Sequence, residues 1–248
     1  NTTGGGGNNL AFTGPASLTG GTTNLNVPTA MTVEFAGGLG ETYSASNLTK
    51  SGFGTLVFSK DSPYSGTTTI DWSGGTLAVT ENGAARNTAF AVYVGGVLQV
   101  GDLGSAIDRT DRISDVATVT LNGGTLALVG TAGAASTEAL GTIALGNNYT
   151  GAVQSVVSPV AGSSARWDLT SVSRAANQGS MLSFQAVGVD LGAATANRIA
   201  FLVPGVLVGT SLALDDGIIP FAVIANPSGL EFATWVNNAT PTSPYTTP

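Results

Sequence analysis

The stretch from Leu48 to Val79, LTKSGFGTLVFSKDSPYSGTTTIDWSGGTLAV, contains two copies of one short unit. The unit is a glycine followed by threonine, leucine and apolar residues, and its copies are Gly54–Phe58 and Gly75–Val79. β-Branched and apolar residues directly after a glycine are typical of a short strand that begins at a tight turn. The stretch therefore predicts two equivalent short strands, one per repeat.

The unit continues beyond this stretch. Gly96–Val100 follows Gly75 at the same offset that separates Gly75 from Gly54, and Gly124–Leu128 follows at a somewhat longer one. Recurrence at a period of about 20–50 residues is typical of repeat folds such as solenoids. We therefore predict an all-β fold, a right-handed parallel β-helix with short strands. One leucine of each unit is expected to point inward, so that these residues form a single column: Leu56, Leu77, Leu98 and Leu126.

The stretch also resembles a known family, the autotransporter-associated β-strand repeat. The resemblance rests on Thr49–Leu56, Tyr64–Thr68 and Gly75–Leu77, and it covers about thirty residues. The family usually has Asn before its Tyr, where this chain has Asp61–Pro63. Gly217–Pro220 and Phe232–Trp235 also resemble segments that accompany these repeats.

Repeats of this family are found in secreted passenger domains and in very large bacterial surface proteins. The resemblance thus implies a parallel β-helix outside the cell, extracellular or on a bacterial cell surface. It implies no particular activity.

Composition points the same way. Only 9% of the residues are charged, against about 25% in ordinary domains, and 35 residues are glycine. A solenoid that exposes ladders of Thr, Ser and Asn needs little charge for solubility. The net charge of −7, with only eight Lys and Arg, argues against nucleic acid and against anionic membrane surfaces as partners. The longest apolar run, 199–208, is interrupted by Pro204 and Gly205 and is too short for membrane insertion.

The chain divides into three parts. Residues 1–9 are a glycine-rich leader, expected to be flexible. Residues 10–236 form the solenoid, with regular repeats over about 48–128 and irregular rungs with longer strands over about 150–236. Residues 237–248 are a Pro/Thr-rich arm or linker.

The sequence lacks the residues of common catalytic sites. It has no His and no Cys, which removes Ser-His-Asp triads, thiol nucleophiles and most zinc sites. Asp215 and Asp216 are the only adjacent acidic pair, and neighbours on a strand point to opposite faces. We therefore expect no enzyme activity, and assign no catalytic, cofactor-binding or metal-ligating residue.

Two features leave alternatives open. The stretch Asp102–Asp115 has four carboxylates and two arginines, and is either a solvated loop or a calcium or sugar site. Its spacing matches neither an EF-hand nor the glycine-rich calcium nonapeptide. Bulky aromatic residues gather near the C-terminal end and form either a cap on the stack or a sugar-binding platform: Trp167, Phe184, Phe221, Phe232 and Trp235.

These observations favour a structural role. A solenoid has unpaired strand edges at both ends, which must be capped or used for assembly. We expect a rigid subunit of a bacterial surface fibre, sheath or surface layer that self-assembles head-to-tail. Its partner is then another copy, or adjacent repeats of the same polypeptide. The alternatives are an adhesin or glycan-binding passenger module, with surface glycans as partners, and a polysaccharide-degrading β-helix enzyme. Thr68 is expected on an exposed outer ladder.

Overall fold

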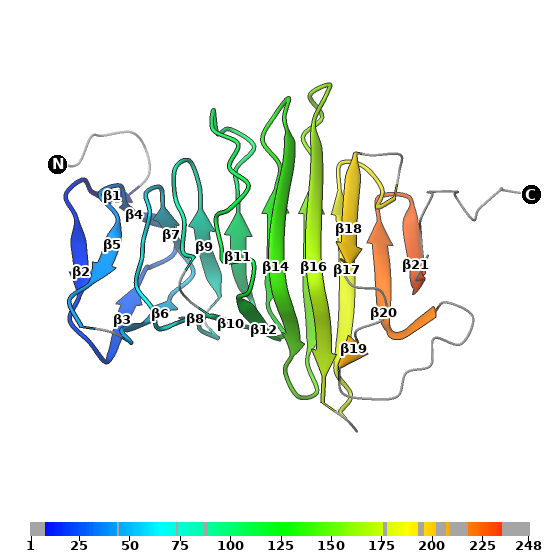
Figure 1. The fold of residues 1–248 in the computed structure, drawn as a ribbon, viewed down its shortest axis with the longest axis horizontal. Helices are drawn as coiled ribbons and strands as arrows, with labels where there is room; N and C mark the ends of the chain where they lie inside the picture. The colour runs from blue at the N-terminus through cyan, green and yellow to red at the C-terminus, as the bar shows by residue number, and fades with distance from the viewer. Residues whose placement is uncertain are drawn as a thin grey trace, which may run out of the picture.

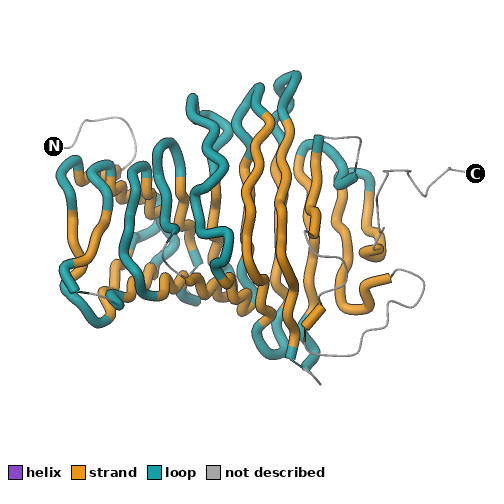
Figure 2. Tube along the Cα trace, in the orientation of Figure 1, coloured by secondary structure: helices purple, strands orange, loops and turns teal. Residues whose placement is uncertain are grey.

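The computed structural model describes residues 8–43, 45–72, 74–86, 89–175, 178–192, 196–201, 207–208 and 218–234. These residues form strands and connecting turns, with no helix among them (Figures 1 and 2). The strands are β1 (Asn8–Phe12), β2 (Ala16–Leu18), β3 (Thr22–Asn26), β4 (Met31–Phe35), β5 (Leu39–Glu41), β6 (Asn47–Ser51), β7 (Thr55–Phe58), β8 (Thr67–Ile70), β9 (Gly75–Val79), β10 (Ala89–Tyr93), β11 (Gly96–Val100), β12 (Thr118–Asn122), β13 (Thr125–Val129), β14 (Ala135–Leu145), β15 (Thr150–Val156), β16 (Ser164–Arg174), β17 (Met181–Val187), β18 (Asn197–Phe201), β19 (Leu207–Val208), β20 (Ile218–Asn226) and β21 (Gly229–Thr234).

The strands stack into two large sheets. The ten-stranded sheet has the order β1-β4-β7-β9-β11-β13-β15-β17-β20-β21. The nine-stranded sheet runs β18-β16-β14-β12-β10-β8-β6-β3, and β19 pairs with β16. The chain alternates between the two sheets as it advances from the N-terminal to the C-terminal end (Figure 1). Every pairing between named strands is parallel except that of β20 with β21. The predicted parallel β-helix is confirmed.

The predicted leucine column runs along the ten-stranded sheet. Leu56, Leu77, Leu98 and Leu126 pair in register on β7, β9, β11 and β13, and each has 0% exposure. The column continues at both ends, through Leu10 and Val33 before it and Val153, Phe184 and Ile224 after it. The coils that separate successive members are shortest between β7 and β11 and become longer toward the C-terminal end. Each coil thus adds one apolar layer to a continuous core, whatever its length.

The nine-stranded sheet has two inward columns, and each includes a fully buried polar side chain. Thr68 pairs with Leu48 and Phe90, and Lys50 pairs with Leu25 and Ile70. Thr68 is 0% exposed, so its predicted place on an outer ladder is wrong. The reason is the two-residue period of a strand, because Ile70 points inward and Thr68 must then point inward too.

A third face closes each coil. Near the N-terminal end it consists of β2 paired with β5, followed by isolated bridges that join Asp61 to Ala84 and Ala85 to Ile113. From β14 onward the third face and the nine-stranded sheet share one 11-residue strand per coil, first β14 and then β16. The longer strands expected in the C-terminal part are therefore present, and the change begins at β14.

The two ends of the stack differ. At the N-terminal end, β1 is the outer strand of the ten-stranded sheet, and all five of its residues are exposed. Strand β1 begins at Asn8, two residues before the predicted start of the solenoid at Leu10. At the other end β21 pairs antiparallel with β20 and closes that sheet. Residues 1–7 of the leader and the whole arm 237–248 lie outside the described residues.

Candidate functional site

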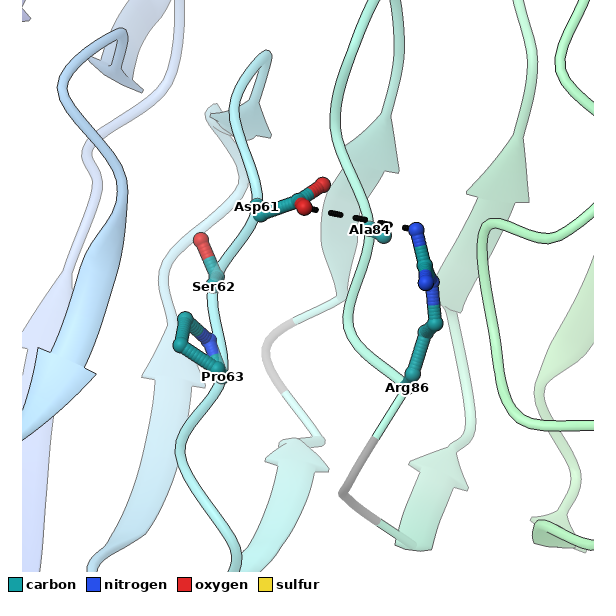
Figure 3. A pocket seen from close by; sticks show the side chains of 5 residues that line it. All are labelled: Asp61, Ser62, Pro63, Ala84 and Arg86. Atoms are coloured by element: carbon teal, nitrogen blue, oxygen red, sulfur yellow. Dashed lines mark ion pairs between the residues drawn. The ribbon is translucent and has the colours of Figure 1, made fainter.

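A polar hollow opens on the third face where backbone pairing is reduced to isolated bridges. It has a volume of about 160 Å³ and is lined by Asp61, Ser62, Pro63, Ala84 and Arg86 (Figure 3). The Asp61 carboxylate is 2.8 Å from Arg109 Nη1 and 4.0 Å from Arg86 Nη2. Exposed pairs of this kind contribute little to stability. The hollow therefore presents an acid that is already neutralised by arginine.

The stretch Asp102–Asp115 lies beside this hollow and is held to the stack by its arginines. Arg109 also donates to the Asn82 carbonyl, and Asp111 pairs with Arg86 at 3.2 Å. In the described part of the chain no three acidic side chains come together as possible metal ligands. The stretch is thus a charged loop bonded to neighbouring coils, and the calcium alternative finds no support in its geometry.

Several ionisable side chains are buried inside the stack, and one of them, Glu138, lies beneath this loop. Glu138 Oε1 accepts backbone N–H bonds from Arg112 at 2.9 Å and Ile113 at 2.8 Å, so a side chain replaces the missing strand carbonyl. Glu138 Oε2 is buried and has no hydrogen-bond partner. Burial raises the pKa of Glu138 to about 8, against the lowering effect of the two N–H bonds and of the Arg112 charge. Below that pH the neutral acid is the main form.

Another buried ionisable side chain is that of Lys50, which takes an inward position on β6. Its Nζ donates to the carbonyls of Gly52 at 2.5 Å and Ser51 at 3.3 Å. Burial lowers the pKa of Lys50 to about 8. Lys50 and Glu138 are both 0% exposed, so neither can reach a dissolved substrate. Their role is to complete hydrogen bonding at turns and strand ends inside the fold.

The aromatic residues near the C-terminal end are mostly core residues. Trp167, Phe184 and Phe221 are 0%, 5% and 4% exposed. Trp167 Nε1 donates to the Gln154 carbonyl at 3.0 Å, and the Arg174 guanidinium lies 5.2 Å from the centre of the Phe221 ring. These three rings fill the last coils, so they cannot form a sugar-binding platform. Trp235, Asp215 and Asp216 lie outside the described residues, as does the side chain of Phe232.

A different aromatic cluster is exposed, and the sequence analysis did not identify it. The ring of Trp72 lies 5.1 Å from that of Tyr93, tilted by 38°, and 5.7 Å from that of Tyr149, edge-on at 69°. Trp72 is 54% exposed, and both tyrosines are partly exposed. We call these three residues the aromatic corner, because they lie where the chain passes from the nine-stranded to the ten-stranded sheet, Tyr93 at the end of β10 and the other two in turns.

The local sequence explains how the corner forms. Ile70 and Val92 pair in register, so Asp71-Trp72 and Tyr93-Val94 leave their strands at the same level of neighbouring coils. Gly123 occupies the turn between Tyr93 and Tyr149, with φ of +89°. A Cβ added there would lie 2.6 Å from Val94 Cγ2 and 3.4 Å from the Tyr149 ring. The missing side chain therefore lets the Val94 and Tyr149 side chains pack over this turn. Alignment of the turns rather than of the strands would have revealed this cluster.

Comparisons with known proteins identify the repeat itself. Residues 48–79 match the family model described as the passenger-associated-transport-repeat. A search of curated proteins and a search of solved structures found no match to the chain. The described residues contain no helix that could cross a membrane. The matched repeat implies a secreted or surface-exposed protein of the autotransporter passenger type. Residues 48–79, coiled as β6 to β9, are thus a passenger-associated transport repeat of the kind that the sequence resemblance predicted.

Proposed function

We propose that this chain is a rigid extracellular structural segment, a subunit of a bacterial surface fibre, sheath or surface layer that adds head-to-tail. The inward column supports this proposal, because its members pair in register from β1 to β20. Parallel pairing spaces successive coils about 4.8 Å apart, so such a stack is a stiff rod. The passenger repeat supports the location outside the cell.

The N-terminal end supports assembly. The ring of Phe12 stacks on that of Phe35 at 5.2 Å and 16°, while Phe12 itself remains 41% exposed. Leu10, the first member of the inward column, is 37% exposed. The equivalent positions are buried in the middle coils, and here the described part of the chain leaves them uncovered. Another coil, from a second copy or from adjacent repeats of the same polypeptide, would continue the column that begins at Leu10 and the stack that begins at Phe12.

The geometry of the ends bears on the type of assembly. Among the described residues the outer edge of β1 is unpaired, whereas the opposite end of the same sheet is the antiparallel strand β21. Two copies of β1 could pair only as antiparallel strands in a closed dimer, whereas a contact between unlike ends would propagate. The sparse charge, 9% of residues, offers little repulsion between subunits. We therefore expect linear filaments rather than closed dimers.

Sedimentation and negative-stain imaging test this function. The intact chain should form filaments whose length grows with concentration, and Phe12→Asp should remain monomeric with an unchanged melting temperature. Phe53→Asp is the matched control, because Phe53 is 67% exposed on a turn away from that end. A wild-type chain that stays monomeric, or a Phe12→Asp variant that assembles normally, would contradict head-to-tail addition.

An adhesive role is the second candidate, and the aromatic corner favours it.

We expect no catalytic activity. The carboxylate of Asp61 at the polar hollow is ion-paired with arginine, and Glu138 is closed to solvent. These two carboxyl groups are therefore poor candidates for the acid–base pair of the polysaccharide-degrading alternative.

A further inference from the structure

We propose that the aromatic corner is a binding surface for neutral carbohydrate. This inference goes beyond the structural role, because a rod can be rigid without it. The corner combines an exposed indole ring with two phenol rings that pack against it from later coils. A single exposed aromatic side chain is ordinary, but an exposed tryptophan packed against two further partly exposed rings forms a contiguous surface of the kind that binds a ligand.

The geometry of the rings selects the class of ligand. The centres of Tyr93 and Tyr149 lie 5.1 Å and 5.7 Å from that of Trp72, so the rings are in contact and leave no cage between them. A quaternary ammonium ion needs a cage of separated rings, which excludes it here. A flat ligand that lies across the outer faces fits better. A pyranose ring has such a flat C–H face, surrounded by hydroxyl groups.

The polar groups around the rings suit those hydroxyls. Asp71 precedes Trp72 in the same turn, and its Oδ1 accepts the backbone N–H of Trp72 at 2.8 Å. Asn122 is paired with Tyr93 across the sheet, and Asn147 is exposed two residues before Tyr149. Carboxylate and amide groups both accept hydrogen bonds from hydroxyls, and an amide also donates. A few polar groups beside aromatic rings are the usual composition of a small-molecule site.

Charge restricts the ligand further. The turns that contain the three rings, 71–74, 93–95 and 146–149, include no Lys or Arg. The only ionisable side chain in them besides the tyrosines is the acidic Asp71, and the whole chain carries a net charge of −7. Two cations lie on neighbouring coils, but Lys50 is buried and Arg174 is engaged by the Gln178 carbonyl and the Phe221 ring. The surface therefore disfavours sulfated, sialylated or phosphorylated ligands. Single-stranded nucleic acid also stacks on aromatic rings, but it requires a cationic groove. Neutral oligosaccharide is the ligand class that remains.

The test is a binding measurement on the intact chain with neutral and acidic probes. Cellohexaose, chitohexaose and maltohexaose represent neutral oligosaccharides, a heparin hexasaccharide represents acidic ones, and tetramethylammonium tests the cage. At least one neutral probe should bind and protect a tryptophan from acrylamide quenching, while the other two probe classes have no effect. Trp167 is fully buried, and Trp235→Phe removes the third tryptophan, so the quenching signal belongs to Trp72.

Variants assign the binding to the corner. Trp72→Ala should weaken the affinity about tenfold or more, as expected for loss of an aromatic anchor, and Trp72→Tyr should weaken it less. Tyr43→Ala is the matched control, because it removes an exposed ring from a different turn, between β5 and β6, and should leave the affinity unchanged. Melting curves check that each variant folds; if Trp72→Ala does not, quenching protection in the Trp235→Phe protein decides.

Three results would overturn the proposal. One is failure of all three neutral probes to bind or to protect Trp72. Another is equal loss of affinity in Trp72→Ala and Tyr43→Ala. The third is preferential binding of the heparin probe or of tetramethylammonium. None of these outcomes depends on filament formation, so the binding surface and the structural role are tested separately.

Discussion

Leu77 shows the stability of the stack at the scale of one residue. It pairs with Leu56 on one side and Leu98 on the other, and all three are fully buried. Leu77→Ala should lower the free energy of unfolding by about 2–5 kcal/mol, because neighbours held by strand pairing on both sides cannot collapse into the cavity. Urea denaturation measures this. A loss below about 1 kcal/mol would contradict the rigid column.

Thr68 gives a second test, with a control beside it. The Thr68 hydroxyl bonds to the hydroxyl of Tyr64, which is 0% exposed. Thr68→Ala would leave the Tyr64 hydroxyl buried without that partner, at a cost of about 1–3 kcal/mol. Thr69→Ala, on the outer side of the same strand, should cost less than about 0.5 kcal/mol. Equal losses in the two variants would mean that inner and outer positions are not distinguished.

The error over Thr68 has a physical origin. A run of three threonines shows no alternation by itself, and its polar side chains favour an outer assignment. The position of Ile70 decides the parity instead, since it must lie in the core. Lys50 is a similar case. Leu48, two residues earlier on the strand, predicts that Lys50 also points inward, but a charged side chain is normally assigned to the surface. The structure explains the buried position of Lys50, because turn carbonyls accept hydrogen bonds from its amino group.

Glu138 makes stability depend on pH. The folded-state pKa of about 8 lies above the ordinary value of 4.5, so the folded chain binds more protons than the unfolded chain between these values. The stability that comes from this group is therefore present in full below about pH 4.5 and is lost as the pH rises through about 8. Glu138→Gln, which keeps the acceptor oxygen, should flatten this fall. Denaturation at a series of pH values across this window measures it, and parallel profiles for the two proteins would refute it.

At the scale of one strand, the first glycine of each repeat has a steric function. Gly75 has φ of +77°, and a Cβ added there would lie 2.4 Å from the Gly52 carbonyl oxygen. The coil before it thus passes too close for any side chain. Gly75→Ala should cost about 2–5 kcal/mol, through backbone strain and overlap together.

Gly14→Ala is the control for Gly75→Ala. A Cβ at Gly14 meets nothing within 4 Å, and its φ lies outside the left-handed region. Its effect on the free energy of unfolding should stay within about 0.5 kcal/mol. If both alanine variants unfold at the same urea concentration as the wild type, the contact between coils is not restrictive at Gly75.

The strands of the ten-stranded sheet could be predicted because several of them begin at a recognisable glycine unit. The third face could not. Its bridges at Asp61, Ala84 and Ile113 are single residues, and one ladder contact is made by the Glu138 carboxylate. A strand signal needs several alternating residues, so one-residue pairings leave no pattern. The same limit hid the aromatic corner, whose residues lie in turns or at a strand end and meet only through the stacking of coils.

For the whole molecule, a stack of coils implies graded stability along the axis. Each coil contacts only its neighbours, so end coils are held on one side. Amide hydrogen exchange should be slowest in the middle strands β9 to β13 and fastest in β1 and β3 at the open end. Native-state exchange measured residue by residue gives this profile. Equal protection in β1 and β9 would indicate one cooperative unit instead.

The coil length has a mechanical consequence. The coil from Leu56 to Leu77 would span roughly 70 Å if its chain were fully extended. In the folded stack the same coil occupies only about 4.8 Å along the axis. The hydrogen bonds between coils lie along the axis of the stack. Tension between the two ends would therefore break them one coil at a time. A chain held at both ends would therefore unfold one coil at a time. Each step would release a length of chain many times the height of the coil that is lost, so the molecule would lengthen under tension before it breaks.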